Sequence, residues 1–284
     1  MRAGPSKRKW PRGAQPASGV LRVTMVDVGQ GDAILVQTPN HHALLVDSGG
    51  TSGVFDIGGR IVVPALWASG VRRLDWLAFT PPDIDHVGGA PAVTADLGPR
   101  EVWEAVPVPP HPARAALVLA ARSHGLVWRQ LLAGHMFEAG GVTVDVRHPP
   151  PPEWERQRTR NDDSLVLRLR FGDVEVLLTG DAGLEFERRE IAALDAEESP
   201  APLRILKVGH HGSLSSSSWS FVRAFHAQAA LVSVGRANTF GHPAPEIVAR
   251  LEDAGAEVFR TDRDGAIILE TDGHTVTIRT MTGR

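Results

Sequence analysis

Four hydrophobic segments of this chain each run directly into a loop that carries aspartate or histidine. The first ends at Asp47, the second leads into residues 83–86, the third ends at Asp181, and the fourth leads into His210 and His211. Segments of this length and composition are typical of buried β-strands. Loops that join strands and helices commonly carry binding side chains on a rigid scaffold. The sequence therefore predicts one polar site, built from four loops at one edge of a sheet.

The order of the predicted elements indicates an α/β fold. A meander opens it, since residues 21–27 alternate apolar and polar side chains and two further strands follow at 33–38 and 43–47. Later strands are predicted at 75–80, 141–147, 163–171, 174–179, 203–208 and 230–234, and helices at 61–69, 112–123, 184–194, 219–227 and 245–254. Helices interleaved with hairpin-built sheets favour two β-sheets flanked by helices on both outer sides.

The chain divides into a short lead-in and one large body. Residues 1–19 are basic and contain Pro, Gly and Ser, which predicts a flexible basic linker, either a tether or a chain end without a role. The body, residues 20–284, is predicted to contain two pseudo-repeated halves, about 20–150 and 151–284, joined by the Pro-rich residues 148–152. Each half has a hydrophobic strand that ends in an acid and glycines, at 43–50 and at 176–183, which hints at a duplication.

Composition excludes several classes of protein. With 42% hydrophobic and 22% charged residues in 284, the chain is a folded globular protein. No uncharged apolar run approaches the roughly 18 residues that span a bilayer. The absence of cysteine excludes disulfides, thiolate metal sites and cysteine nucleophiles.

Charge is unevenly distributed along the chain. The lead-in carries five basic residues and no acidic one, which leaves 25 basic against 33 acidic residues in the body. An acidic body does not attract nucleic acid by its overall field. A phosphate-bearing substrate would therefore need a local patch or bound cations.

The side chains at the four loops are those of a metal site. Aspartate oxygens and imidazole nitrogens suit a divalent ion such as Zn²⁺, Mn²⁺ or Fe²⁺. The lack of thiolates argues against a purely structural zinc site. An open, hydrolytic metal site is the interpretation that these residue types favour.

Beyond these patterns, the sequence resembles a known family. The motifs D-V-G-Q-G-D-A-I-L-V, L-L-V-D-S-G-G, F-T-P-P-D-I-D-H-V-G-G, N-D-D-S-L-V-L, V-L-L-T-G-D, L-K-V-G-H-H-G-S, G-H-P and R-T-D-R-D-G occur in the order seen in the metallo-β-lactamase-like domains of ComEC-type DNA-uptake channels. The resemblance covers roughly residues 20–280. It implies a metallo-β-lactamase-like αββα sandwich.

The resemblance also implies a set of metal ligands, drawn from Asp83, Asp85, His86, Asp181, His210 and His211. It leaves open which histidine of the adjacent pair binds, with His210 slightly preferred. The family motif usually has a histidine where this chain has Pro81, which offers no ligand atom. One tight Mn²⁺ or Zn²⁺ site is therefore expected, together with a poorer second site around Asp83. As alternatives, Asp85 could merely cap a helix and Asp181 could be a turn acid.

Further roles are expected for residues near these ligands. Catalytic roles are assigned to Asp83, Asp181, His211 and His242, and contacts with substrate to Asn161, Ser164, Ser213 and His242. An aspartate would orient the attacking water, while His242 or the non-ligating histidine of the pair would steady the departing oxygen. Asn161 and Ser164 could equally be strand caps. Asp47 is expected to brace a ligand, and the turn of Asp27, Gln30, Gly31 and Asp32 to be structural.

By resemblance, the function is that of a metal-dependent phosphodiesterase, a DNA nuclease that hydrolyses the strand that is not imported. Its partners would be single-stranded DNA and the membrane channel of a parent protein, at the extracytoplasmic face of the membrane. The alternative is a non-catalytic domain that guides DNA or has a structural role, with a metal site degraded at Pro81. A hydrolase of small phosphodiesters is a third interpretation.

Overall fold

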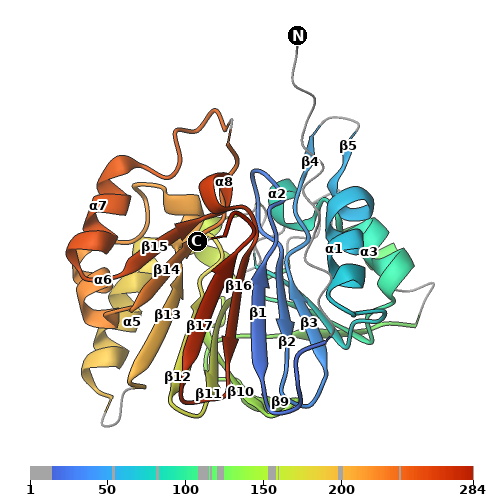
Figure 1. Ribbon diagram of the computed structural model, residues 1–284, viewed down its shortest axis with the longest axis horizontal. Helices are drawn as coiled ribbons and strands as arrows, with labels where there is room; N and C mark the ends of the chain where they lie inside the picture. Colours follow the sequence, from blue (N-terminus) through green and yellow to red (C-terminus); the bar gives the residue numbers. More distant parts are fainter. Residues whose placement is uncertain are drawn as a thin grey trace.

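The computed structural model describes residues 15–284 except 53–54, 81–82, 108–114, 116, 120–124, 153–157, 159, 198–200, 237 and 284. Pro81 and most of the predicted helix 112–123 therefore lie outside the described residues. The described chain forms two large β-sheets that face one another, with helices on both outer sides (Figure 1). The predicted two-sheet α/β sandwich is confirmed.

The first sheet has eight strands in the order β17-β16-β1-β2-β3-β6-β7-β8. Its bounds are β1 Leu21–Met25, β2 Ile34–Gln37, β3 Ala43–Val46, β6 Trp76–Phe79, β7 Glu101–Glu104, β8 Val127–Gln130, β16 Ile267–Thr271 and β17 Val276–Thr280. The strands from β17 to β3 pair antiparallel, as the predicted meander requires, and those from β3 to β8 pair parallel. A small hairpin of β4 (Thr51–Ser52) and β5 (Phe55–Asp56) lies apart.

The second sheet has seven strands in the order β15-β14-β13-β12-β11-β10-β9. They are β9 Met136–Ala139, β10 Val142–His148, β11 Val166–Phe171, β12 Val174–Leu178, β13 Leu203–Lys207, β14 Ala229–Val232 and β15 Glu257–Arg260. The sheets do not divide at residue 150, since β9 and β10 join the second sheet and β16 and β17 return to the first. The predicted duplication stays a prediction.

Helices cover the outer face of each sheet. The π-helical turn η1 (Gly58–Val62), α1 (Val63–Ala68) and α3 (Ala90–Leu97) pack on the first sheet, and α5 (Leu184–Asp195), α6 (Trp219–Phe225) and α7 (Pro245–Asp253) on the second (Figure 1). One buried apolar cluster fills the space between the sheets, and two others lie beneath the two helical layers. Strands such as β12 are buried along their whole length because both faces are covered.

The predicted linker is partly held to the body. The side chain of Gln15 donates to the carbonyl of Gly70, and Gly19 N donates to the carbonyl of Pro39. Residues 1–14 lie outside the described part. Among the described residues, no helix is long and apolar enough to cross a membrane.

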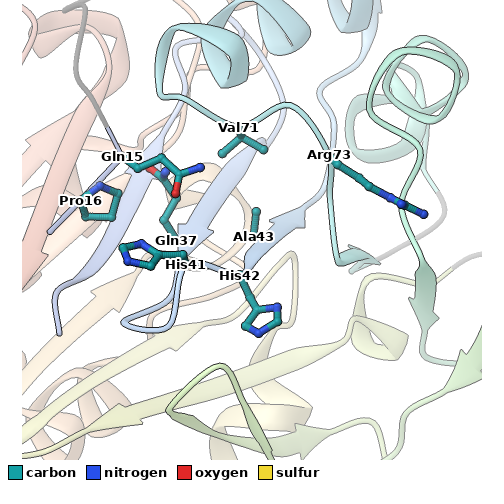
Figure 2. Close-up of a pocket in the computed structure, with 8 residues that line it drawn as sticks. All are labelled: Gln15, Pro16, Gln37, His41, His42, Ala43, Val71 and Arg73. Carbon is teal, nitrogen blue, oxygen red and sulfur yellow. The ribbon is translucent and has the colours of Figure 1, made fainter. Parts of the chain in front are cut away.

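A small cavity lies where this segment meets the body (Figure 2). Its volume of about 30 Å³ is room for roughly one water molecule. Gln37 at the end of β2 and Ala43 at the start of β3 line it, together with Gln15, Pro16, His41, His42, Val71 and Arg73. The loops predicted to carry the polar site leave these strands at their other ends, so the cavity is remote from that site.

Candidate metal centre

Four side chains from three loops and one short helix meet at one end of the sandwich. Asp85 and His86 lie on α2 (Ile84–Val87), which follows β6. Asp181 follows β12, and His211 lies in the short helical segment η3 (Gly209–Gly212), which follows β13. One ligand atom from each residue lies within 4.8 Å of the others. These four residues are called the metal quartet below.

The distances within the metal quartet suit a shared ion. His86 Nε2 lies 3.2 Å from Asp181 Oδ2, and His211 Nε2 lies 3.5 Å from Asp85 Oδ2 and 3.7 Å from Asp181 Oδ1. Both Nε2 atoms and Asp181 Oδ1 are buried, with no hydrogen-bond partner in the described part of the chain. Buried polar atoms are normally satisfied, so three orphans that face one point require a missing partner. Two imidazoles and two carboxylates fit a divalent transition metal.

Asp47 sets the orientation of the His86 ring. His86 Nδ1 donates to Asp47 Oδ2 over 2.8 Å. The same carboxylate accepts the backbone N–H of Thr80 at 2.8 Å and its hydroxyl at 2.6 Å. Because Nδ1 is held in this way, Nε2 faces the metal quartet, as in many carboxylate–histidine–metal arrangements. This is the bracing role expected of Asp47.

His211 is oriented from the other half of the molecule. Its Nδ1 donates to the carbonyl of Ser233, which follows β14, over 2.9 Å. The Ser233 hydroxyl in turn donates to the carbonyl of Gly31 over 2.7 Å. A backbone acceptor at Nδ1 leaves Nε2 as the atom that a metal can take.

The charges of the quartet shift its pKa values in opposite directions. Burial alone would lower the pKa of His86, but the carboxylates of Asp181 and Asp47 outweigh it and raise that pKa well above 6.5. Burial likewise opposes the charge of Asp32 at His211, whose pKa is also raised. Burial would raise the pKa of Asp181, yet His86 and His211 hold it far below its usual range. The acids stay ionised and a positive charge is favoured between them.

The sequence reasoning missed Lys207, a fully buried lysine at the end of β13. Its Nζ lies 2.5 Å from Asp32 Oδ2 and donates to the carbonyl of Gly180 over 2.7 Å. Asp32 also lies near the Nδ1 atoms of the two ligand histidines, at 3.8 Å from His86 and 3.6 Å from His211. A lone lysine inside a hydrophobic strand was the available signal, because lysine is almost never fully buried without a partner.

The two adjacent histidines point in different directions. Both have left-handed backbones, with φ of 47° at His210 and 55° at His211. The structure brings His211, and not His210, into the metal quartet. His210 Nε2 lies 3.8 Å from Asp181 Oδ2, while its Nδ1 contacts the hydroxyl of Ser215 at 2.9 Å. Burial lowers the pKa of His210, so the ring is neutral at pH 7.

Asp83 stands beside the quartet and outside it. It is half-buried at the start of α2, where its carbonyl accepts from His86 N at 3.0 Å and Val87 N at 2.9 Å. The groups of potential ligands among the described residues are the quartet and the set Asp32, Asp47 and His86. The position of Pro81 next to it lies outside those residues.

The residues expected to contact substrate divide into two groups. Asn161 on η2 (Asn161–Asp163) has its Nδ2 3.2 Å from His210 Nε2, and Ser213 contacts Ser215 through their hydroxyls at 3.0 Å. Ser164 is fully buried, and its hydroxyl accepts the backbone N–H of Asp181 over 3.2 Å. Ser164 therefore positions Asp181 in this structure.

His242 lies next to this group in the loop before α7. Its ring centroid is 5.8 Å from that of His210, and the side chain is half-exposed. Burial and the neighbouring His210 lower the pKa of His242. The ring thus stands near the metal quartet without belonging to it.

The glycine-rich turn before β2 packs against the ligand loops. Asp27 Oδ1 accepts Gly29 N at 3.4 Å, and Gln30 Oε1 accepts Gly235 N at 3.3 Å. A Cβ at Gly31 would lie 2.2 Å from the carbonyl oxygen of Asp85, so only glycine fits this approach. Asp32 differs from its neighbours because it holds Lys207.

Comparison with known proteins places these features in a family. The model of the family described as "Metallo-beta-lactamase superfamily" matches residues 26–236. "ComE operon protein 3" of Bacillus subtilis is 28% identical over 86% of this chain, and "Competence protein ComA" of Neisseria gonorrhoeae is 32% identical over 86%. The chain spans about a third of the length of these relatives, 32% and 31% respectively.

Solved structures agree on the fold. The metallo-β-lactamase fold protein YhfI of Bacillus subtilis superposes with a TM-score of 0.56 at 13% identity, covering 88% of this chain and 100% of that one. A diphosphatase of the PhnP family gives 0.50 at 13% identity, covering 89% and 98%. Since the family model spans most of the body and the same two-sheet fold carries its ligand loops, this chain belongs to the metallo-β-lactamase superfamily and is related to the competence proteins named above.

Proposed function

We propose that this chain is a metal-dependent phosphodiesterase that cleaves single-stranded DNA. The observation that carries the proposal is the metal quartet, in which three buried ligand atoms face one point without a partner in the described chain. Asp85, His86, Asp181 and His211 would hold the ion, with Mn²⁺ or Zn²⁺ as the expected metal. A divalent ion there supplies Lewis acidity, which activates water near neutral pH and neutralises charge on a phosphoryl oxygen.

The chain's own groups would divide the remaining work. Asp181, ionised and held by Ser164, can accept a hydrogen bond from the attacking water, and Asp83 offers a second carboxylate beside it. His210 and His242 are neutral at pH 7 and can donate an N–H to the phosphate or the departing oxygen. Asn161 and Ser213 add neutral hydrogen-bonding groups around His210.

The biological setting that we propose follows from the relatives. Two of them are named as competence proteins, and they are about three times as long as this chain. The domain would act next to the membrane channel of a parent protein, at the extracytoplasmic face. There it would hydrolyse the DNA strand that is not imported.

Metal content and cleavage together test the proposal. We expect the purified chain to bind about one Mn²⁺ or Zn²⁺ per molecule and to cleave a labelled single-stranded oligonucleotide when that ion is present. Asp181→Ala removes a carboxylate shared by both histidine ligands, so metal stoichiometry and cleavage should both fall to background. A matched control is Asp173→Ala, since Asp173 is an exposed acid in the turn after β11, paired with His274.

The alternative is a non-catalytic domain that guides DNA. The sequence feature in its favour is Pro81, which stands where the family motif usually has a histidine. DNA binding without cleavage in the presence of Mn²⁺, Zn²⁺ and Mg²⁺ would establish this alternative. An unchanged metal stoichiometry in Asp181→Ala would show that the quartet is not the metal site.

A further inference from the structure

Five rings form a continuous row from the protein surface to the metal quartet. Phe240 stacks on His242 with centroids 5.9 Å apart and planes 17° from parallel. His242 contacts His210 at 5.8 Å, and His210 contacts His211 at 6.3 Å. His211 stacks on His86 at 5.6 Å. This row is called the ring ladder below.

The outer end of the ring ladder is an exposed apolar ring on a braced loop. Phe240 is 68% exposed. Its loop is held by Asn238, whose Oδ1 accepts Phe240 N at 3.2 Å and His242 N at 3.0 Å. The amide of Asn238 also donates to the carbonyls of His242 and Gly235, both at 2.8 Å. The loop therefore keeps a large apolar ring in water at a fixed place beside the site.

We infer that Phe240 is a stacking platform for a nucleotide base adjacent to the phosphate at the metal quartet. The inference rests on the proposed function and specifies how its substrate is recognised. Every base has a π-face, so an exposed aromatic ring binds single strands with little sequence preference. In a duplex the bases are stacked on one another, so a ring beside the phosphate site finds a partner only in an unpaired strand.

The charge of the molecule explains why such a contact is needed. The body carries 25 basic and 33 acidic residues, so its overall field does not attract DNA. The histidines nearest the open side, His210 and His242, have lowered pKa values and add no positive charge at neutral pH. A stacking contact supplies affinity that does not depend on cationic side chains.

The test compares an oligonucleotide with a strand of equal length that lacks bases. The two probes are a labelled dT12 and a fully abasic 12-mer with the same phosphates. We expect the wild-type chain to bind dT12 more tightly, by about 5- to 150-fold for one stacked base. This preference should appear in anisotropy titrations with EDTA as well as in kcat/KM with metal, because stacking needs no ion.

Variants of Phe240 isolate the ring. Phe240→Ala should reduce the preference for dT12 to near unity without changing metal content, and Phe240→Trp should retain it. Trp67→Ala is the matched control, because Trp67 is an aromatic residue 39% exposed on α1, outside the ring ladder, and its loss should leave the preference unchanged.

Each outcome has a defined meaning. A dT12 preference that survives in Phe240→Ala overturns the stacking platform while leaving the nuclease proposal intact, and would assign the exposed ring to contact with another protein. A wild-type chain that cleaves neither probe with any metal sinks the proposed function. In that case a preference that Phe240→Ala abolishes in EDTA still supports the platform for a DNA-guiding domain.

Discussion

At the scale of single residues, Lys207 acts as a permanent cation beneath the metal quartet. Its ion pair with Asp32 is fully buried, and it links β13 to the turn before β2. Removing one partner of such a pair leaves an uncompensated buried charge. Lys207→Met should therefore lower the free energy of unfolding by about 3–5 kcal/mol, measured by urea denaturation.

Two companion variants make this prediction specific. The double variant Lys207→Met with Asp32→Leu should recover much of the loss, because replacing a whole buried pair with apolar groups is often nearly neutral. Arg189→Ala breaks an exposed pair with Glu185 and should cost less than about 1 kcal/mol. Equal losses in the Lys207 and Arg189 variants would show that the buried pair carries no special weight.

His86 makes the metal-free protein sensitive to alkaline pH. Its folded pKa is raised well above the ordinary 6.5, so its contribution to stability is complete below pH 6.5 and is lost as pH rises through the folded pKa. A metal at Nε2 must displace this proton, so metal affinity should rise over the same interval.

Denaturation of metal-free protein between pH 6 and pH 9 measures this effect. We expect stability to fall as pH increases, and saturating Zn²⁺ to flatten the decline because the ion then supplies the charge. His211 titrates in the same direction and adds to the trend. Rising stability of the metal-free form toward pH 9 would contradict the assignment.

At the scale of elements, strand ends build the site, and Asp47 shows how. It leaves β3 with a φ of 60°, accepts two hydrogen bonds from Thr80 after β6, and orients His86 on α2. Loss of a partner that orients a metal ligand usually costs 10- to 100-fold in affinity. Asp47→Ala should therefore weaken metal binding by about that factor, as measured by calorimetry.

Asp75 supplies a control at the opposite ends of the same strands. Its Oδ2 accepts Ala43 N over 3.0 Å, so it ties β3 to the start of β6 far from the quartet. Asp75→Ala should weaken this tie and leave metal affinity unchanged. If both variants lost affinity equally, general loosening of the sheet would explain the effect at Asp47.

The pattern of hydrophobic segments predicted the strand ends well, because burial leaves a periodic trace in the sequence. The helices from 184, 219 and 245 also begin where the sequence indicated. The choice between His210 and His211 depended on two consecutive left-handed residues, which side-chain type does not encode. The roles of Lys207 and Ser164 depend on contacts with residues 17 or more positions away, so no local pattern could reveal them.

At the scale of the whole molecule, the sheets exchange strands between the ends of the chain. β16 pairs with β1, and β10 pairs with β11 across the Pro-rich residues 148–152. Hydrophobic periodicity identifies a strand but not its partner, which is why the predicted boundary near residue 150 does not coincide with a sheet boundary. The metal quartet likewise takes two ligands from each side of that boundary, so neither half could form it alone.

The basic lead-in provides the last prediction, which concerns salt. Its five basic residues all lie within residues 1–14, while Gln15 anchors the chain just after them. Single-stranded DNA binding weakens with salt by about 0.7 logarithmic units per phosphate contact. Deleting residues 1–14 should therefore make a plot of log affinity against log salt shallower by up to about 3.5, with the two forms converging at high salt.

The same titration separates charge from stacking. Phe240→Ala should weaken binding by a similar factor at every salt concentration, since a ring–base contact releases few counterions. The deletion should instead act mainly at low salt. Parallel lines for the full chain and the deleted chain would show that the lead-in makes no contact with DNA, and the affinity of this acidic body would then have to come from the metal quartet and the ring ladder alone.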